Sequence, residues 1–138
     1  MNAREAMTPA PLTVTPRTSV AAALRLARDN GIAHLPVLEH GRIVGVLRQE
    51  RLLALTPSEG TTLSRHELHE ALAALTVERA VEPALTLEAT TSLADAARLV
   101  LEHGAPELLV VEDDRLVGIL THSDLRRALI GPEPEAAA

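Results

Sequence analysis

Phenylalanine, tyrosine, tryptophan, cysteine and lysine are all absent from this chain of 138 residues. Without aromatic rings the sequence has no platform on which a base or a sugar can stack, which disfavours binding of single-stranded nucleic acid. The absence of cysteine excludes disulfides, thiol nucleophiles and thiolate metal sites. The absence of lysine excludes Schiff-base chemistry and a lysine-dependent phosphate loop.

Basic charge is also scarce. The formal net charge is −6 and the isoelectric point lies near 5.5, so the chain repels phosphate backbones and we expect no nucleic-acid partner. No apolar run approaches the roughly 20 residues of a membrane-spanning helix, and the N-terminus has no signal-peptide pattern. We therefore predict a cytoplasmic protein with no membrane partner. A hydrophobic content of 46% indicates a globular domain with an aliphatic core.

The strongest positive feature is an internal repeat. Residues 18–47 align without a gap on residues 91–120, and fourteen of the thirty aligned residues are identical, where chance would give roughly two or three. The identities include polar, apolar and glycine positions such as Ser19 with Ser92 and Gly45 with Gly118. The chain therefore contains a duplicated unit.

Each copy shows the same order of periodicities. In the first copy the expected elements are a strand at 12–15, a helix at 19–30, strands at 35–38 and 42–46, and a helix at 49–55. In the second copy they are a strand at 84–88, a helix at 92–103, strands at 107–111 and 115–120, and a helix at 122–130. A further helix, capped by Ser64, is expected between the copies at 65–75.

These patterns predict an α/β fold of two β-α-β-β-α repeats, packed face to face with pseudo-two-fold symmetry and joined by a linker helix. One such repeat has too little core to stand alone. We expect repeat 1 at 1–58, the linker helix at 59–78, repeat 2 at 79–131 and a frayed tail at 132–138.

The chain resembles a tandem CBS-domain pair, also called a Bateman module. The resemblance covers nearly the whole chain, and residues 62–72 are similar to the linker helix of stand-alone bacterial CBS pairs of the acetoin-utilisation-like type. The motifs that carry it are Met7-Thr8-Pro9, Val14-Thr15-Pro16, Gly31-Ile32-Ala33-His34-Leu35-Pro36-Val37 and Gly118-Ile119-Leu120-Thr121-His122-Ser123-Asp124.

This resemblance implies a regulatory module rather than an enzyme. CBS pairs typically bind an adenosine-containing ligand such as AMP, ADP, ATP or S-adenosylmethionine in the clefts between their repeats. They require no cofactor and have no catalytic chemistry of their own. They commonly form homodimers, flat discs of four repeats, so a homodimer is implied here, and the regulated protein partner stays unknown.

The turn at the end of the second copy carries the candidate ligand site. Thr121 or Ser123 is expected to cap a helix that has Asp124 in its first turn, and a carboxylate there can accept hydrogen bonds from the two vicinal hydroxyls of a ribose. Gly118, followed by Ile119, would allow close approach to the strand backbone. The alternative is that these residues only cap the helix.

Residues outside this turn complete the predicted site. Ala105 and Pro106, with residues of the opposite repeat from Val14 to Thr18, are expected to form the wall on the adenine side. Glu107 stands where nucleotide-binding relatives often have a basic residue, and its charge would repel phosphates. This departure favours AMP, an adenosine-like cation or no ligand over a triphosphate.

The first copy differs at this turn, since Arg48 and Arg51 replace the threonine and the aspartate. A guanidinium cannot accept a hydrogen bond, so we expect no ribose to bind there. Arg48 and Arg51, with His34, are candidate contacts for an anion or for the phosphates of a nucleotide bound at the other site. The alternative is that both arginines are solvated or paired with acidic residues.

Other chemistry finds little support. His66 and His69, with Glu67 and Glu70, have a spacing that could ligate a metal on one helix face, but no third ligand is identifiable, and no metal site is predicted. Neighbouring His122, Ser123 and Asp124 cannot form a proton relay on one helix. Two hypotheses remain: a homodimeric adenosine-binding regulatory module, or a ligand-free CBS-pair scaffold that acts through dimerisation or partner contact.

Overall fold

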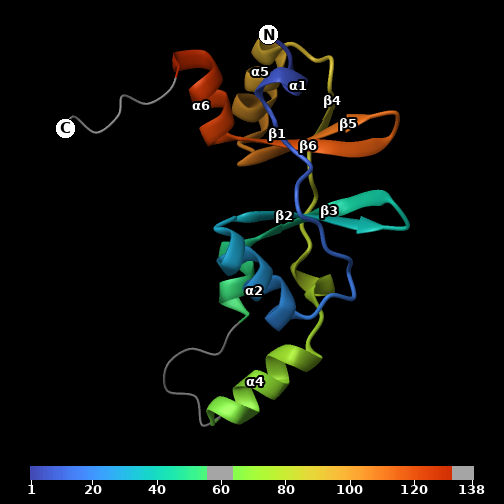
Figure 1. The fold of residues 1–138 in the computed structure, drawn as a ribbon, viewed down its shortest axis with the longest axis vertical. Coiled ribbons are helices and arrows are strands. Elements are labelled where there is room, and N and C mark those ends of the chain that lie inside the picture. The colour runs from blue at the N-terminus through green and yellow to red at the C-terminus, as the bar shows by residue number, and fades with distance from the viewer. Residues whose placement is uncertain (56–63, 132–138) are drawn as a thin grey trace, which may run out of the picture. The chain divides into compact units, whose positions relative to one another are not determined.

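A computed structural model describes residues 1–55 and 64–131, and these form two compact units (Figure 1). The repeat 1 unit comprises Leu12–Pro83, and the repeat 2 unit comprises Met1–Pro11 together with the chain from Ala84 onward. The loop expected at 56–60 and the tail expected at 132–138 lie outside the described residues.

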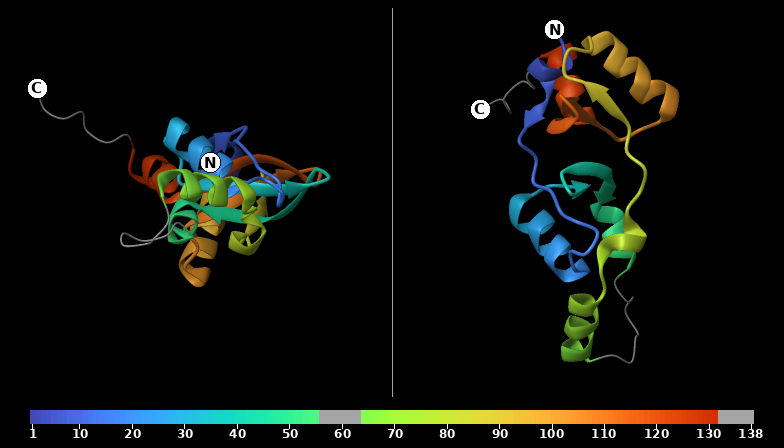
Figure 2. Two further views of the ribbon diagram at one scale, coloured as in Figure 1. Left: turned by 90° about the horizontal axis from the view of Figure 1, so that it is seen from below. Right: turned by 90° about the vertical axis from the view of Figure 1, so that its right-hand side faces the viewer.

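The repeat 2 unit is a sheet covered by helices on one face. Figure 1 shows α1, α5 and α6 on the same side of the strands, and the second panel of Figure 2 agrees. The strand order is β1-β6-β5-β4, in which β4 and β5 are parallel and the other neighbours antiparallel. Its elements are α1 (Ala3–Ala6), β1 (Thr8–Pro9), β4 (Thr86–Glu88), α5 (Leu93–His103), β5 (Glu107–Glu112), β6 (Arg115–Thr121) and α6 (His122–Ile130).

The repeat 1 unit is built on the hairpin of β2 and β3. A parallel bridge from Val14 to Val37 and an antiparallel bridge from Glu82 to Val46 flank the hairpin, and they stand where β4 and β1 stand in the other unit. The strand expected at 12–15 is thus reduced to a single bridge. The elements of the repeat 1 unit are α2 (Val20–Asn30), β2 (His34–Glu39), β3 (Arg42–Arg48), α3 (Gln49–Ala54), α4 (Arg65–Ala74) and the 3₁₀ helix η1 (Val77–Ala80).

Local signals explain why both copies fold alike. Ser19 and Ser92 cap α2 and α5, because each hydroxyl accepts a hydrogen bond from the amide three residues later. Both helices end at a glycine in the left-handed conformation, Gly31 and Gly104, each with φ of 60°. The two-residue turns between the hairpin strands also have positive φ throughout, as type I′ turns require.

Each unit has its own aliphatic core. Leucine, valine and alanine side chains from one helix face pack on the inner face of the sheet, and full burial of each larger one contributes about 1.5–3 kcal/mol. The core of the repeat 2 unit contains Ala3, Leu87, Ala89, Leu93, Ala96, Val100, Leu108, Val110, Leu120 and Leu125. The core of the repeat 1 unit contains Val14, Val20, Ala23, Ala27, Leu35, Val37, Leu47, Leu52, Val77 and Ala80.

The N-terminal segment packs with the second repeat rather than with the first. We expected repeat 1 to span residues 1–58; in the structure Met1–Pro11 belongs to the same compact unit as residues 84–131. Two contacts account for this: Ala3 is fully buried in that unit's core, and β1 pairs with the outer edge of β6. The residues expected to form the linker, in turn, lie in the repeat 1 unit, where α4 packs on α2.

Candidate functional site

The turn between β6 and α6 is a capping box. Thr121 is the N-cap residue, and its hydroxyl accepts a hydrogen bond from the Asp124 amide at 3.4 Å. The Asp124 carboxylate returns the interaction, because its Oδ2 accepts from the Thr121 amide at 3.0 Å and from the Thr121 hydroxyl at 3.1 Å. The two residues therefore fix each other at the positive end of α6, where a negative charge is stabilised.

A third residue holds the Asp124 carboxylate from another part of the chain. The Thr8 hydroxyl donates to Oδ1 at 3.0 Å, and the Arg127 guanidinium lies 3.6 Å from the same oxygen. Only 3% of the Asp124 side chain is exposed, whereas Thr8 is exposed. A carboxylate has about four acceptor positions, and Thr8 and Thr121 fill three of them with direct hydrogen bonds.

The glycine before this turn accommodates the chain's own backbone. Gly118 lies beside Pro9 in the pairing of β6 with β1, and a Cβ atom at Gly118 would overlap the Met7 side chain and meet the Thr8 carbonyl oxygen. Ile119 pairs with Thr8 and is buried. The close approach expected at Gly118 is therefore made here by β1.

The residues expected on the adenine side within repeat 2 do lie next to the turn. The His122 ring donates through Nε2 to the Ala105 carbonyl oxygen at 3.0 Å, and Glu107 is the strand partner of Thr121. Pro106 stands between them in the chain and is partly buried. Glu107 is 2% exposed, so a carboxylate is buried at the edge of the candidate site.

Three further residues were expected to contact the ligand: one is exposed, and the other two have contacts within the repeat 1 unit. Ser123 is exposed in the first turn of α6. Val14 and Thr18 lie in the repeat 1 unit. Val14 is buried and bridges to Val37, and the Thr18 hydroxyl accepts a hydrogen bond from the Thr15 amide at 3.1 Å. Both are thus parts of the local structure that precedes α2.

The corresponding turn of the repeat 1 unit contains an ion pair. The Arg48 guanidinium donates to the Glu82 carboxylate, and His34 is the strand partner of Arg48. Arg51 is exposed on α3. Arg48 is the N-cap residue of α3 and makes no side-chain cap. The arginine that replaces the capping threonine is thus paired with an acidic residue of the same unit.

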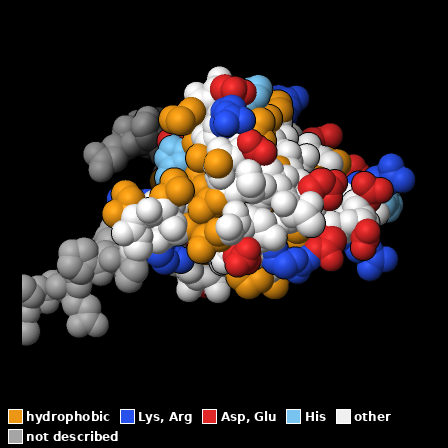
Figure 3. Space-filling model, turned by 90° about the horizontal axis from the view of Figure 1, so that it is seen from above, with side chains coloured by type: hydrophobic (Ala, Val, Ile, Leu, Met, Phe, Trp, Pro, Cys, Tyr) orange, Lys and Arg blue, Asp and Glu red, His pale blue; other side chains and the backbone are white. Residues whose placement is uncertain are grey.

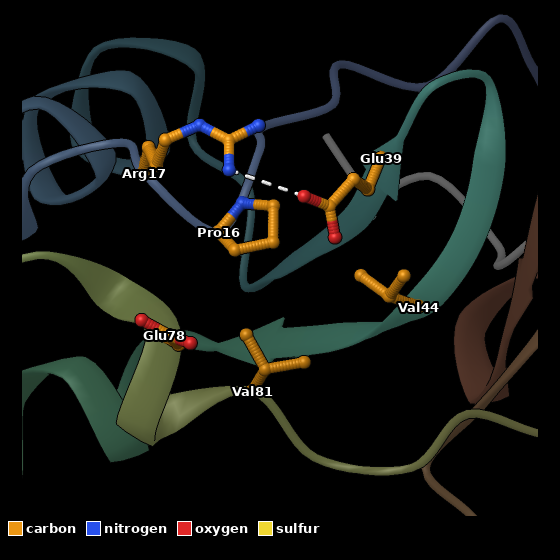
Figure 4. Close-up of a pocket in the computed structure, with 6 residues that line it drawn as sticks. All are labelled: Pro16, Arg17, Glu39, Val44, Glu78 and Val81. Carbon is orange, nitrogen blue, oxygen red and sulfur yellow. Dashed lines mark hydrogen bonds and ion pairs between the residues drawn. The ribbon is translucent and has the colours of Figure 1, made fainter.

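A small pocket of about 210 Å³ lies elsewhere in the repeat 1 unit (Figure 4). Pro16, Val44 and Val81 give it an apolar lining. The Arg17 guanidinium reaches across toward Glu39, at 3.1 Å, and Glu78 lines the other side. Pro16 and Arg17 lie in the stretch from Val14 to Thr18 that the sequence assigns to the adenine-side wall, whereas the expected contacts at the turn of repeat 2 lie in the other unit.

One of the two histidines of α4 pairs with an acidic residue of the same helix. His66 lies 3.0 Å from Glu70 on the next turn of the helix. Within residues 1–55 and 64–131, no group of three or more His, Cys, Asp and Glu side chains is arranged to hold a metal ion. Over the same residues, every helix is too short or too polar to span a bilayer.

Two residues that contact these turns, Thr8 and Glu82, were not predicted from the sequence to do so. They occupy equivalent places, because Thr8 pairs with Ile119 on β6 and Glu82 bridges to Val46 on β3, and these two partners are aligned in the repeat. A signal was present in the sequence: Ala6-Met7-Thr8-Pro9-Ala10 recurs as Ala80-Val81-Glu82-Pro83-Ala84. Its spacing differs by one residue from that of the main repeat, so an ungapped alignment does not include it.

Both halves of the chain are similar to the same family of known proteins. Residues 3–57 and 77–131 each match the CBS domain family. The chain is 26% identical over 122 residues to the CBS domain-containing protein YhcV of Bacillus subtilis, with 88% of this chain and 81% of YhcV aligned. It is 32% identical over 137 residues to the chloroplastic protein CBSX2 of Arabidopsis thaliana, with 85% of this chain but only 58% of CBSX2 aligned.

Two solved structures illustrate the similarity in fold. A crystal structure of CBSX2 in complex with AMP has a TM-score of 0.77 and 32% sequence identity, covering 96% of this chain and 99% of that one. A putative acetoin utilization protein, AcuB from Vibrio cholerae, has a TM-score of 0.76 and 23% identity, covering 94% of this chain and 90% of that one.

Proposed function

The chain belongs to the CBS domain family as a tandem CBS pair, and we propose that it is a regulatory module that binds an adenosine-containing ligand, chiefly at the turn of repeat 2. The observation that carries this proposal is the Asp124 carboxylate, held at the start of α6 by Thr121 and Thr8. The solved complex of CBSX2 with AMP supports the choice of ligand class, because that protein shares 32% of its aligned residues with this chain.

Ribose binding at Asp124 requires one existing contact to yield. A vicinal diol donates two hydrogen bonds, whereas three of the roughly four acceptor positions of the carboxylate are filled. The two bonds from Thr121 close the capping box, but the bond from Thr8 comes from an exposed residue, whose hydroxyl can turn to water instead. We therefore propose that a ribose hydroxyl takes the place of the Thr8 hydroxyl on Oδ1.

The charges around the turn favour a ligand with few phosphates. Glu107, buried beside Thr121, would repel a phosphate chain when it is ionised. Arg127, whose side chain is largely exposed, is a cation close enough to Asp124 to contact one phosphate. AMP is the ligand that we propose first, before ADP, ATP and S-adenosylmethionine. We propose no catalytic role and no required cofactor.

Titration of the full chain with AMP, ADP, ATP and S-adenosylmethionine tests this function, followed by calorimetry and by thermal unfolding. A ligand at 100 times its dissociation constant stabilises the fold by about 2.7 kcal/mol, which raises the unfolding midpoint by several degrees. Asp124→Asn removes the charge that the ribose needs and should weaken binding by at least about tenfold.

Asp95→Asn is the matched control. Asp95 is the third residue of α5, as Asp124 is of α6, and each is preceded by a capping hydroxyl. Asp95 is exposed and pairs with Arg98, so this variant should bind the ligand as well as the unmodified chain does. If no ligand binds at millimolar concentration, or if the two variants bind equally well, the proposed function is wrong.

We also propose a homodimer. Hydrophobic side chains are exposed between charged ones on the face shown in Figure 3. Within the repeat 2 unit, Leu101 of α5 is 83% exposed and Ile130 of α6 is 80% exposed, and a second copy could cover both. Leu101→Asp with Ile130→Asp should convert the dimer to a monomer in light scattering, whereas Val44→Asp, at an exposed valine of the repeat 1 unit, should not.

The alternative is a ligand-free CBS-pair scaffold that acts through dimerisation or through contact with a partner. One observation favours it: the carboxylate that would bind a ribose is buried and already engaged by Thr8 and Thr121. The titration separates the two functions, because a scaffold dimerises without any response to the nucleotides.

A further inference from the structure

Thr8 and Glu82 occupy the same position in the two units and engage the same turn. Each lies at the outer edge of the second hairpin strand, beside Ile119 in one unit and Val46 in the other. From this edge position the Thr8 side chain reaches Asp124, and the Glu82 side chain reaches Arg48. The residue at the edge position and the residues of the turn are therefore matched in chemistry: a hydroxyl with a carboxylate, and a carboxylate with a guanidinium.

The Glu82–Arg48 pair is built on a fixed backbone. The Glu82 amide donates to the Val46 carbonyl oxygen at 3.0 Å, and the Val46 amide donates to the Glu82 carbonyl oxygen at 2.9 Å. The side chain of Arg48 is 17% exposed and that of Glu82 is 32% exposed. Screening by water is weaker at this pair than at the exposed Arg17–Glu39 pair, where Arg17 is 69% exposed.

A guanidinium presents donors in a planar fork that suits phosphate and carboxylate oxygens equally well. At the turn of the repeat 1 unit this fork already meets a carboxylate of the same chain. An external anion must compete with Glu82 for the donors of Arg48 and must also approach the negative charge of Glu82. The first copy therefore contains a donor suited to anions together with an acidic residue that competes for it.

We propose that Glu82 is the specificity-determining residue of the repeat 1 turn, and that it excludes phosphate from Arg48. Arg48 excludes the ribose because it accepts no hydrogen bond, and Glu82 excludes the anion that Arg48 would otherwise bind. This makes the turn of repeat 1 closed to both halves of a nucleotide.

Titration with inorganic phosphate at low ionic strength, followed by two-dimensional NMR of the ¹⁵N-labelled full chain, tests this proposal. Glu82→Gln removes the competing charge and keeps the size of the side chain. We expect its phosphate dissociation constant to fall by about tenfold relative to the unmodified chain, with the largest shifts at Arg48 and Gln49. The double variant Arg48→Gln with Glu82→Gln should return to the affinity of the unmodified chain.

Glu78→Gln is the matched control, because Glu78 is an exposed residue of η1 and the variant has the same net charge. Equal phosphate affinity of Glu82→Gln and Glu78→Gln overturns the proposal, and so does a gain that persists in the double variant. If Glu82→Gln does not fold, Glu82→Asp takes its place: the shorter side chain loosens the pair, so phosphate binding rises if Glu82 is the barrier and is unchanged if it is not.

Phosphate binding at this turn does not depend on nucleotide binding at repeat 2. The phosphate titration and the adenosine-ligand titration can therefore fail separately, and each failure identifies which proposal is wrong.

Discussion

The Thr8 hydroxyl donates a hydrogen bond to Oδ1 of Asp124, a residue 116 positions later in the chain, at 3.0 Å. Thr8 belongs to β1, which pairs with the outer edge of β6, and Asp124 belongs to the first turn of α6, which follows β6. The bond therefore connects the N-terminal segment to the turn that carries the candidate site. Because Asp124 is buried, the loss of this donor leaves a charged oxygen with fewer partners.

Thr8→Val should lower the free energy of unfolding by about 1–2 kcal/mol, since a hydrogen bond to a buried charged group is lost. Urea denaturation followed by circular dichroism measures this change. Thr8→Ser keeps the hydroxyl and should restore most of the stability. Thr86→Val is a control on the exposed surface of β4, expected within about 0.5 kcal/mol of the unmodified chain. Equal stability of Thr8→Val and Thr86→Val would contradict a role for the bond.

Thr8→Val should bind AMP more tightly than the unmodified chain does. If a ribose hydroxyl replaces the Thr8 hydroxyl on Asp124, the substitution removes a bond from the protein without ligand and none from the complex. The expected gain is about fivefold in affinity, equivalent to about 1 kcal/mol. Calorimetry on Thr8→Val and Thr8→Ser measures it. Weaker AMP binding by Thr8→Val but not by Thr8→Ser would mean that Thr8 keeps its hydrogen bond to Asp124 in the complex and orients the carboxylate.

Gly45 and Gly118 are aligned in the repeat but should respond differently to alanine. A Cβ atom at Gly45 would overlap the Glu82 carbonyl oxygen, and two hydrogen bonds with Val46 hold the Glu82 backbone in place. At Gly118 the nearest atoms belong to the flexible Met7 side chain. We expect Gly45→Ala to cost about 1–3 kcal/mol and Gly118→Ala clearly less, measured by thermal unfolding of both variants. The reverse order would show that the edge segment of the repeat 2 unit is the less adaptable one.

The repeated elements were predictable because their signals are local. Ser19 and Ser92 at the helix starts, and Gly31 and Gly104 at the helix ends, fix α2 and α5 within one residue of the expected bounds. The capping alternative for the repeat 2 turn could likewise be deduced from spacing alone, since Thr121 and Asp124 lie three residues apart. Whether that turn also binds a ribose is a question that spacing does not decide.

The edge segments could not be predicted in the same way. β1 contains two residues, too few for any periodicity, and its partner Ile119 lies more than a hundred residues along the chain. The contacts of Thr8 and Glu82 arise only when an edge strand is added to the sheet. An alanine as small as Ala3 gives no sign in the sequence that it will be fully buried.

Deletion of residues 1–11 should destabilise the repeat 2 unit selectively. The deletion removes Ala3 from its core, the pairing of β1 with β6 and the Thr8 bond to Asp124. Hydrogen exchange should therefore accelerate at the amides of β5 and β6, while those of β2 and β3 keep their protection. Deletion of 132–138, the segment at the other end, is the control. Uniform acceleration in both hairpins would contradict the assignment of the N-terminal segment to one unit.

A single adenosine ligand should bind each chain. The turn of repeat 2 has a carboxylate, a group that can accept hydrogen bonds from a ribose, whereas its counterpart has Arg51 at the aligned position and Arg48 in an ion pair with Glu82. Calorimetry with AMP should give a stoichiometry near one per chain, and NMR shifts should map to Thr121 and Asp124 rather than to Arg48. A stoichiometry near two would show that the first turn binds a nucleoside without the carboxylate, and the asymmetry argued from these residues would be wrong.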